Sequence, residues 1–185
     1  MSIFRRFLRR ERKVNPKEMI KNFEIGRQML MNKTRETCEK LRKKGYRVLE
    51  ITPLLVSVGK AEKDTPFGIM LLVNDEMFKK FHTYLDMGTY ANNQLNLFSV
   101  GEYSFLLVTA RDDERKVAIC YPSAFRKKHV KKIQSGDKVY FYIINGQTNK
   151  FTLIYFPNVK WEDKTKEIKG EIKQSRDKPP STLYR

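Results

Sequence analysis

The acidic residues are the first group in this sequence whose types and spacing could perform chemistry. Asp112, Asp113 and Glu114 follow an apolar run and are followed by Lys116. Carboxylates at the end of a strand can hold Mg²⁺ and orient a water molecule, so a small metal-dependent nuclease is one hypothesis. A charged turn between two strands produces the same pattern, and we favour the turn because no other ligand is placed by spacing.

Other groups that catalysis commonly uses are sparse in the sequence. His82 and His129 have no partner at a metal-ligand spacing, and neither GxxxxGK[ST] nor GxGxxG occurs. His82 falls in an aromatic-rich helical pattern, which favours a structural role. Cys38 and Cys120 lie far apart without a CxxC pattern, as expected of reduced packing cysteines in a cytoplasmic protein. We therefore assign no catalytic residue, metal or cofactor and expect a non-enzymatic protein.

Positive charge is the most informative property of the sequence. The 185 residues contain 38 Lys+Arg and 21 Asp+Glu, a formal net charge of +17. A balance this large predicts a polyanionic partner, which is nucleic acid or an anionic membrane surface. Residues 1–47 alone hold 16 Lys+Arg and 5 Asp+Glu, and a second cluster lies near residue 130. The candidate nucleic-acid-binding residues are Arg5, Arg6, Arg9, Arg10, Arg126, Lys127, Lys128, Lys131 and Lys132.

The N-terminal segment Met1–Lys13 combines apolar and basic residues at helical spacing. Three hypotheses fit it: an arm that wraps nucleic acid, an interfacial membrane anchor, or a plain packing helix. The sequence has no apolar run of about 20 residues, so no membrane-spanning helix is expected. An apolar region of the kind found in secretory signals is also missing after the basic start.

The spacing of apolar and capping residues then predicts a helix followed by alternating strands and short helices. Asn15 with Pro16 starts a helix that runs to Lys44 and stops at Gly45, weakened at Gly26 and Asn32, so that it is one helix or two. The exposed side of this helix is either a solvated face or a surface that contacts phosphates. The following elements are expected at Tyr46–Val58 (strand interrupted at Pro53), Phe67–Val73 (strand), Asn74–Gly88 (helix), Thr89–Val100 (loop or irregular strand) and Tyr103–Ala110 (strand).

The stretch from Arg115 to Pro157 predicts a strand, a basic helix and a hairpin. We expect the strand to stop at Pro122 and Ser123 to cap a helix running to Val130. Lys138–Ile144 and Lys150–Phe156 form the hairpin around an Asn-Gly turn. Two tyrosines of the first hairpin strand, Tyr140 and Tyr142, could stack on unpaired bases or serve as a packing surface.

This stretch also resembles known DNA-binding modules. Pro122-x-x-x-Arg126 followed by Ile133-x-x-Gly136-Asp137-x-Val139 is similar to the AbrB/MazE-type module, a swapped-hairpin barrel. The segment Gly136–Phe156 is similar to the end of the plant-type B3 domain. The interval from Pro122 to Gly136 is longer than in the AbrB type, and this chain is larger. The resemblance, over residues 116–156, implies a small β-barrel that binds DNA.

Together these patterns predict an α+β protein. Basic N-terminal helices over residues 1–45 precede a small, mainly antiparallel β-barrel with two short helices over residues 46–160, and residues 161–185 form a charged, flexible tail. The expected function is nucleic-acid binding through phosphate contacts, with duplex DNA ahead of RNA. The alternatives are a peripheral membrane or assembly protein anchored by its N-terminus, and a small metal-dependent nuclease.

Overall fold

Helix α1 (Pro16–Lys43) is a single continuous helix in the computed structural model, which describes residues 15–157 and 168–170. Its start and end are confirmed: the Asn15 side chain accepts a hydrogen bond from the Lys17 N–H (3.0 Å), and Gly45 has a φ of +84°. The predicted arm with Arg5, Arg6, Arg9 and Arg10 lies outside the described residues, as does nearly all of the tail predicted for residues 161–185.

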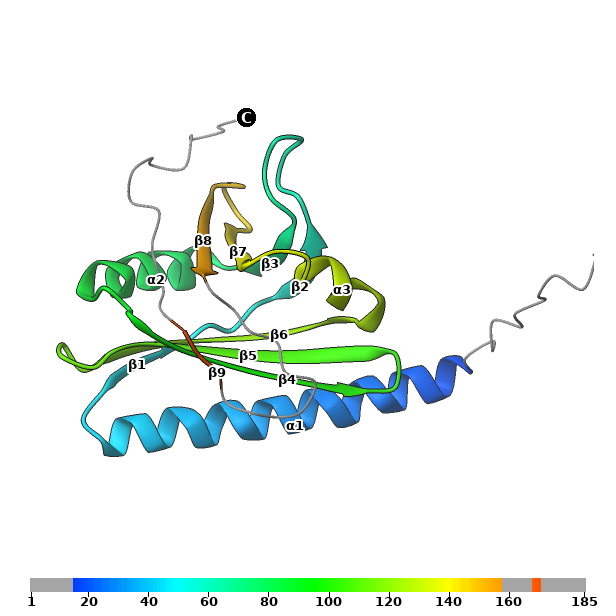
Figure 1. Ribbon diagram of the computed structural model, residues 1–185, viewed down its shortest axis with the longest axis horizontal. Helices are drawn as coiled ribbons and strands as arrows, with labels where there is room; N and C mark the ends of the chain where they lie inside the picture. Colours follow the sequence, from blue (N-terminus) through cyan, green and yellow to red (C-terminus); the bar gives the residue numbers. More distant parts are fainter. Residues whose placement is uncertain (1–14, 158–167, 171–185) are drawn as a thin grey trace, which may run out of the picture.

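The strands form two mixed sheets, so the predicted α+β class is confirmed (Figure 1). The first sheet has the order β1-β6-β5-β4-β9 and the second β2-β3-β7-β8; β1 is parallel to β6, β3 is parallel to β7, and the other pairs are antiparallel. The first sheet contains β1 (Arg47–Glu50), β4 (Asn92–Val100), β5 (Tyr103–Asp112), β6 (Val117–Arg126) and β9 (Ile168–Gly170). The second contains β2 (Leu55–Gly59), β3 (Gly68–Val73), β7 (Lys138–Asn145) and β8 (Phe151–Pro157).

The predicted closed barrel is not found among the described residues. The chain passes from the first sheet to the second between β1 and β2, around Pro53, and the two sheets remain separate in the strand order. They pack face to face over a shared apolar core, into which helix α2 (Asp75–Met87) inserts its fully buried Phe81. The N-cap predicted for α2 is confirmed, because the Asn74 side chain accepts the Met77 N–H at 2.8 Å.

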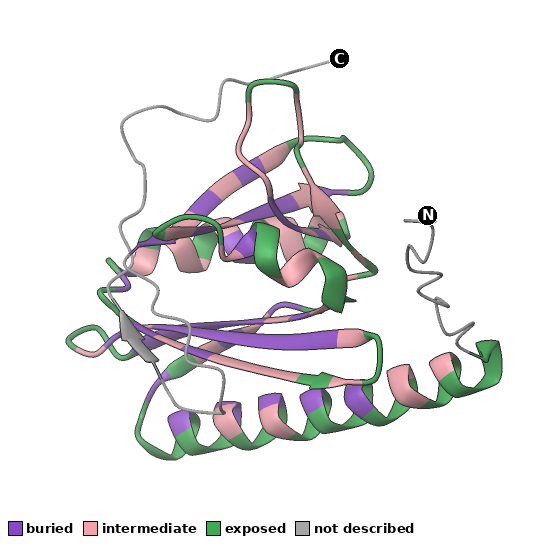
Figure 2. Cartoon of the chain, turned by 45° about the vertical axis from the view of Figure 1, so that its right-hand side comes forward, coloured by how far each residue is buried: buried purple, intermediate pink, exposed green. Residues whose placement is uncertain are grey.

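Strand β5 is buried on both faces, which explains its continuous apolar sequence. Leu106 and Val108 face the core between the sheets, whereas Phe105 and Leu107 face α1. A second apolar core lies between α1 and the first sheet, and it contains Cys38 of α1 and Cys120 of β6. Both are buried free thiols, and their sulfur atoms lie 3.6 Å apart. The predicted packing role of the cysteines is confirmed. Figure 2 shows the opposite side of α1 exposed along its length.

Residues 89–100 were predicted as a loop or an irregular strand, and residues 92–100 form the regular strand β4. Pairing with β5 on one side and β9 on the other outweighs the low strand propensity of their amides. The predicted end of β6 was wrong. Strand β6 continues through Pro122 to Arg126, so Ser123 does not cap a helix. The helical part is only the 3₁₀ turn η1 (Lys127–His129) and the single turn α3 (Val130–Ile133).

Pro122 is tolerated inside β6 because its nitrogen faces the side where β1 has already ended. Ile51 N–H donates to the Cys120 carbonyl, so Cys120 directs its backbone groups toward β1. Backbone direction alternates along a strand, and Pro122 therefore faces the same way. The β1–β6 pairing stops at Glu50 and Cys120, and the missing N–H costs no hydrogen bond within the sheet.

Among the described residues, no helix has both the length and the apolar character needed to cross a bilayer.

Gly26 allows α1 to approach the first sheet closely, and its replacement tests this packing. A Cβ at Gly26 would overlap the ring of Phe105, which is fully buried. We expect Gly26→Ala to lower the free energy of unfolding by about 1–2 kcal/mol, because overpacking outweighs the gain of about 1 kcal/mol in helix propensity. Urea unfolding measures the change.

The control for this prediction is Gln28→Ala, on the exposed side of the same helix, which should have little effect. Adding Phe105→Leu to Gly26→Ala should cost less than the two changes separately, because the ring that clashes is gone. Equal effects of Gly26→Ala and Gln28→Ala would contradict the close packing.

Candidate nucleic-acid interface and a neighbouring apolar cleft

The five described cations of the predicted site lie together at the end of β6. Arg126 is the last residue of β6, Lys127 and Lys128 belong to η1, and Lys131 and Lys132 belong to α3. All five are exposed. The connection is held in place by the Lys127 N–H, which donates to the Glu102 carbonyl at 2.8 Å, and by the buried side chain of Ile133. We call these five residues the basic connection.

Two cations of the basic connection lie over aromatic rings, and none of the five takes part in a described salt bridge. The Arg126 guanidinium lies 5.0 Å from the centre of the Tyr103 ring, and Lys132 Nζ lies 4.3 Å from the centre of the Phe67 ring. The salt bridges found within residues 15–157 all involve other cations. Burial lowers the pKa of His129, and the nearby positive charges of Lys128, Lys132 and Arg126 lower it further. The site therefore has a local positive potential that favours an anion.

The basic connection lies at the end of the fold where α1 begins (Figure 1). Tyr103 links the two, because its ring lies 5.0 Å from that of Phe23 in α1 and beneath Arg126. Basic residues in the last turn of α1 lie at the opposite end of this 28-residue helix: Lys40, Arg42 and Lys43. The structure therefore separates the described positive charge into at least two groups.

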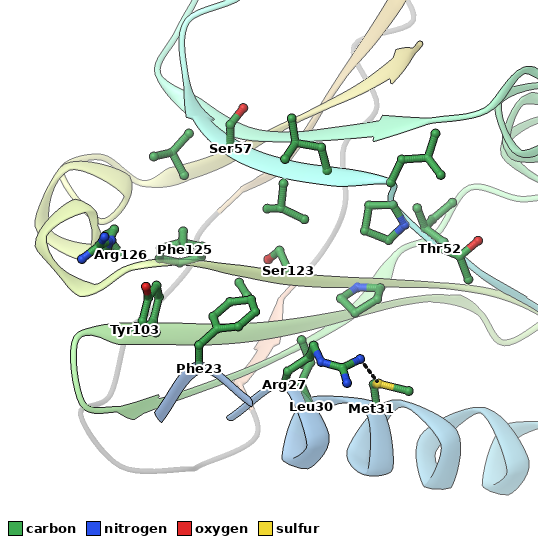
Figure 3. A pocket seen from close by; sticks show the side chains of 18 of the residues that line it. Phe23, Arg27, Leu30, Met31, Thr52, Ser57, Tyr103, Ser123, Phe125 and Arg126 are labelled. Atoms are coloured by element: carbon green, nitrogen blue, oxygen red, sulfur yellow. Dashed lines mark hydrogen bonds between the residues drawn. The ribbon is translucent and has the colours of Figure 1, made fainter. Parts of the chain in front are cut away.

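An open cleft of about 790 Å³ lies next to the basic connection, between α1, β2 and the end of β6 (Figure 3). Its walls are largely apolar. Two arginines and one histidine also line it: Arg27, Arg126 and His129. Arg27 is already paired with Glu24 and also contacts the Met31 sulfur at 3.2 Å. Three of the exposed large apolar side chains line the cleft: Met31 (41% exposed), Leu54 (67%) and Leu55 (60%). Sequence reasoning missed this cleft, because its walls come from distant segments.

A second, smaller hollow of about 470 Å³ lies on the outer face of the second sheet. Tyr140 and Tyr155 line it with ring centres 6.1 Å apart, and Lys138 Nζ lies 4.9 Å from the centre of the Tyr155 ring. Tyr142 is buried and its hydroxyl donates to the Pro66 carbonyl, so this ring is unavailable for stacking on a base. Of the two tyrosines singled out from the sequence, only Tyr140 is accessible.

The acidic group around residue 113 forms the turn between β5 and β6. Asp112 is buried and accepts hydrogen bonds from the backbone N–H groups of Thr89, Glu114 and Arg115. Burial opposes ionisation of Asp112, but these hydrogen bonds and the Arg115 guanidinium outweigh it and lower the pKa to about 2. Asp113 accepts hydrogen bonds from the Tyr46 hydroxyl (2.6 Å) and the Asn92 amide (2.8 Å). Both carboxylates therefore have structural partners.

His82 also has a structural environment. Its Nε2 lies 2.8 Å from the Thr152 hydroxyl, and its ring packs 4.8 Å from that of Phe78. Burial lowers the pKa of His82. In the part of the chain that the structure describes, no group of three or more His, Cys, Asp or Glu residues could hold a metal ion.

The fold and site define an α+β protein with an exposed basic connection beside an apolar cleft. The chain belongs to a family of unknown function (DUF7529), whose family model matches residues 23–147. The match includes the cleft, the basic connection and most of both sheets. No curated protein matches the chain. No solved structure matches it either.

Removing the Asp112 charge tests the role of the acidic turn. The pKa of about 2 lies below the ordinary 3.8, so ionised Asp112 stabilises the fold above about pH 4, and this contribution is lost as the pH falls toward 2. We expect Asp112→Asn to lower the free energy of unfolding at pH 7 by about 2 kcal/mol. The variant should also lose less stability than the wild type between pH 5 and pH 2.

Urea unfolding at a series of pH values measures both effects. Glu114→Gln, an exposed neighbour in the same turn, is the matched control and should follow the wild-type curve. Parallel acid limbs for Asp112→Asn and the wild type would show that this carboxylate does not stabilise the turn.

Proposed function

We propose that this protein is a non-enzymatic, cytoplasmic nucleic-acid-binding protein that prefers duplex DNA over RNA. The observation that carries the proposal is the basic connection, where five exposed cations lie within seven residues without an acidic partner in the described salt bridges. Spaced phosphates are the polyanion that such a surface suits best. The two free buried thiols fit a reducing compartment.

The basic connection supports phosphate contacts rather than recognition of base sequence. Its side chains are mainly lysines, which bind phosphate as mobile point charges. The α3 helix is a single turn, too short to place several side chains along a major groove. We therefore expect affinity to depend steeply on salt and weakly on sequence.

The nuclease alternative receives less support from the site. Asp112 and Asp113 are occupied by hydrogen bonds from their own turn, and the described residues contain no metal-binding cluster. The membrane alternative depends on Met1–Lys13, which lies outside the described residues. It remains an outcome to be separated by experiment.

Neutralising the basic connection is the direct test. A variant with Lys127, Lys128, Lys131 and Lys132 changed to Gln should bind a 20-base-pair duplex more weakly. The dependence of log K on log salt should become shallower by about 0.9 for each phosphate contact removed, because fewer counterions are released. Fluorescence anisotropy at several salt concentrations measures this slope.

The matched control removes the same charge at the far end of α1, by changing Lys40, Arg42, Lys43 and Lys44 to Gln. We expect this variant to bind almost as the wild type does. Equal losses in both variants would mean that binding is diffuse attraction to a basic protein. Loss of duplex binding together with flotation on anionic liposomes, abolished by deleting residues 1–13, would favour the membrane alternative.

The hollow on the second sheet distinguishes single strands from duplexes. Tyr140 and Tyr155 line this hollow. Unpaired bases stack on accessible aromatic rings, whereas the bases of a duplex are already stacked within it. Changing both tyrosines to Leu should leave duplex affinity unchanged and weaken single-stranded DNA or RNA by about 1–3 kcal/mol if these rings are a stacking platform. An unchanged affinity for all three probes would assign the tyrosines to packing alone.

A further inference from the structure

The edge of β6 from Pro122 to Arg126 has no neighbouring strand on the side of the cleft. Strand β1 pairs with residues 117–120 of β6 and then leaves for the second sheet. The Lys116 and Cys120 carbonyls accept hydrogen bonds from Arg47 and Ile51, which fixes the direction of the even-numbered residues toward β1. By the same alternation, the backbone groups of Pro122, Ala124 and Arg126 point past the end of β1.

Four backbone groups on this edge therefore lack a strand partner within the described sheet. They are the carbonyl of Pro122, the N–H and carbonyl of Ala124, and the N–H of Arg126. The odd-numbered residues of this segment are engaged with β5 on the other side. An open edge of this kind is a template for another extended chain.

The cleft in front of this edge is open and largely apolar, which suits an extended peptide. Residues 122–126 form one wall, α1 forms the floor with Leu30 and Met31, and β2 forms the opposite wall (Figure 3). Exposed apolar side chains that border an open strand edge are typical of protein interaction sites.

Charge differs between the two ends of the cleft. Figure 3 shows Arg126 at one end and Thr52 toward the other. His129, three residues after Arg126, and Glu50, two residues before Thr52, also line the cleft. The six-residue step from Cys120 to Arg126 corresponds to about 20 Å of strand. A segment seated here would meet the positive charge of Arg126 at one end.

We propose that the cleft binds an extended peptide segment of a partner protein, which adds to β6 as a further strand. Its alternate side chains are apolar, and an acidic residue lies beside Arg126. This inference does not rest on nucleic-acid binding. It gives the protein a second partner surface, which adjoins the basic connection and shares Arg126 with it.

The alternation of donors and acceptors is what favours a peptide over other occupants. A fatty acid or similar amphiphile fills apolar space but cannot pair with the two N–H groups and two carbonyls along the edge. A nucleic-acid strand would place its phosphates against the apolar walls formed by Met31, Leu54 and Leu55. A peptide backbone matches the edge and leaves its side chains for the walls.

The test uses a phage-displayed library of random octapeptides against the full chain at 0.3 M salt. The selected peptides are then measured on the Ala124→Pro variant, which takes no part in the selection. Ala124→Pro deletes an N–H that has no strand partner, and Pro122 shows that the same edge accommodates a proline ring. Ala124→Ser, which keeps the N–H, is the matched control, and thermal unfolding checks that both variants fold.

We expect selected peptides to share alternating apolar residues and an acidic end. Their affinity, measured with fluorescein-labelled synthetic copies, should fall about tenfold or more on Ala124→Pro and stay within about twofold on Ala124→Ser. Only every second N–H of an added peptide strand faces β6. N-methylation of that set of amides should cause a similar loss, and N-methylation of the other set should not. Arg126→Glu should shift the preference of the selected end from acidic to basic.

Several results would overturn the proposal. One is the absence of any enriched peptide family, and another is binding that survives both Ala124→Pro and N-methylation of either set of amides. Saturable binding of laurate in the cleft without peptide binding would assign it to a small amphiphile. A dimer in sedimentation velocity that dissociates on Ala124→Pro would assign the edge to a second copy of this chain. The assay contains no nucleic acid, so its failure leaves the proposed function untouched.

Discussion

The early end of β1 is the constraint on which the rest of this structure depends. β1 pairs with only four residues of the ten-residue strand β6 before the chain crosses to the second sheet. This crossing keeps the two sheets separate, frees the outer edge of β6, and leaves the cleft between α1 and β2. It also explains how a proline can lie inside β6 without the loss of a sheet hydrogen bond.

The charge of the protein follows this architecture only in part. The basic connection begins where β6 ends, so its cations lie at the rim of the cleft, and Arg126 belongs to both surfaces. The cations at the end of α1 lie at the far end of the fold. Net charge predicted a polyanionic partner, and the fold divides the described charge between the basic connection and the end of α1. The apolar cleft and the basic connection are adjacent and share one arginine, Arg126, so the two proposed binding surfaces meet at that residue.

Local signals in the sequence predicted the elements whose ends depend on local chemistry. Asn15, Gly45 and Asn74 correctly marked helix ends, because capping and positive φ involve only neighbouring residues. Gly26 was misleading as a possible break in the helix. A glycine lies here because α1 packs closely against Phe105, which is 79 positions away in the chain. The amide-rich β4 and the proline-containing β6 were not predicted as full strands. Their length and regularity depend on pairing with neighbouring strands in the sheet.

The sequence by itself determined the α+β class, the packing role of the cysteines, and the basic cluster at residues 126–132, because composition, periodicity and short-range spacing set them. Only the tertiary structure decided that the strands form two sheets without a closed barrel, that Tyr142 is buried, and that an open strand edge faces an apolar cleft. The physical reason is that strand pairing joins segments far apart in the chain. The strand pairs that form determine which strand edges remain free, and a local sequence pattern does not predict these pairs.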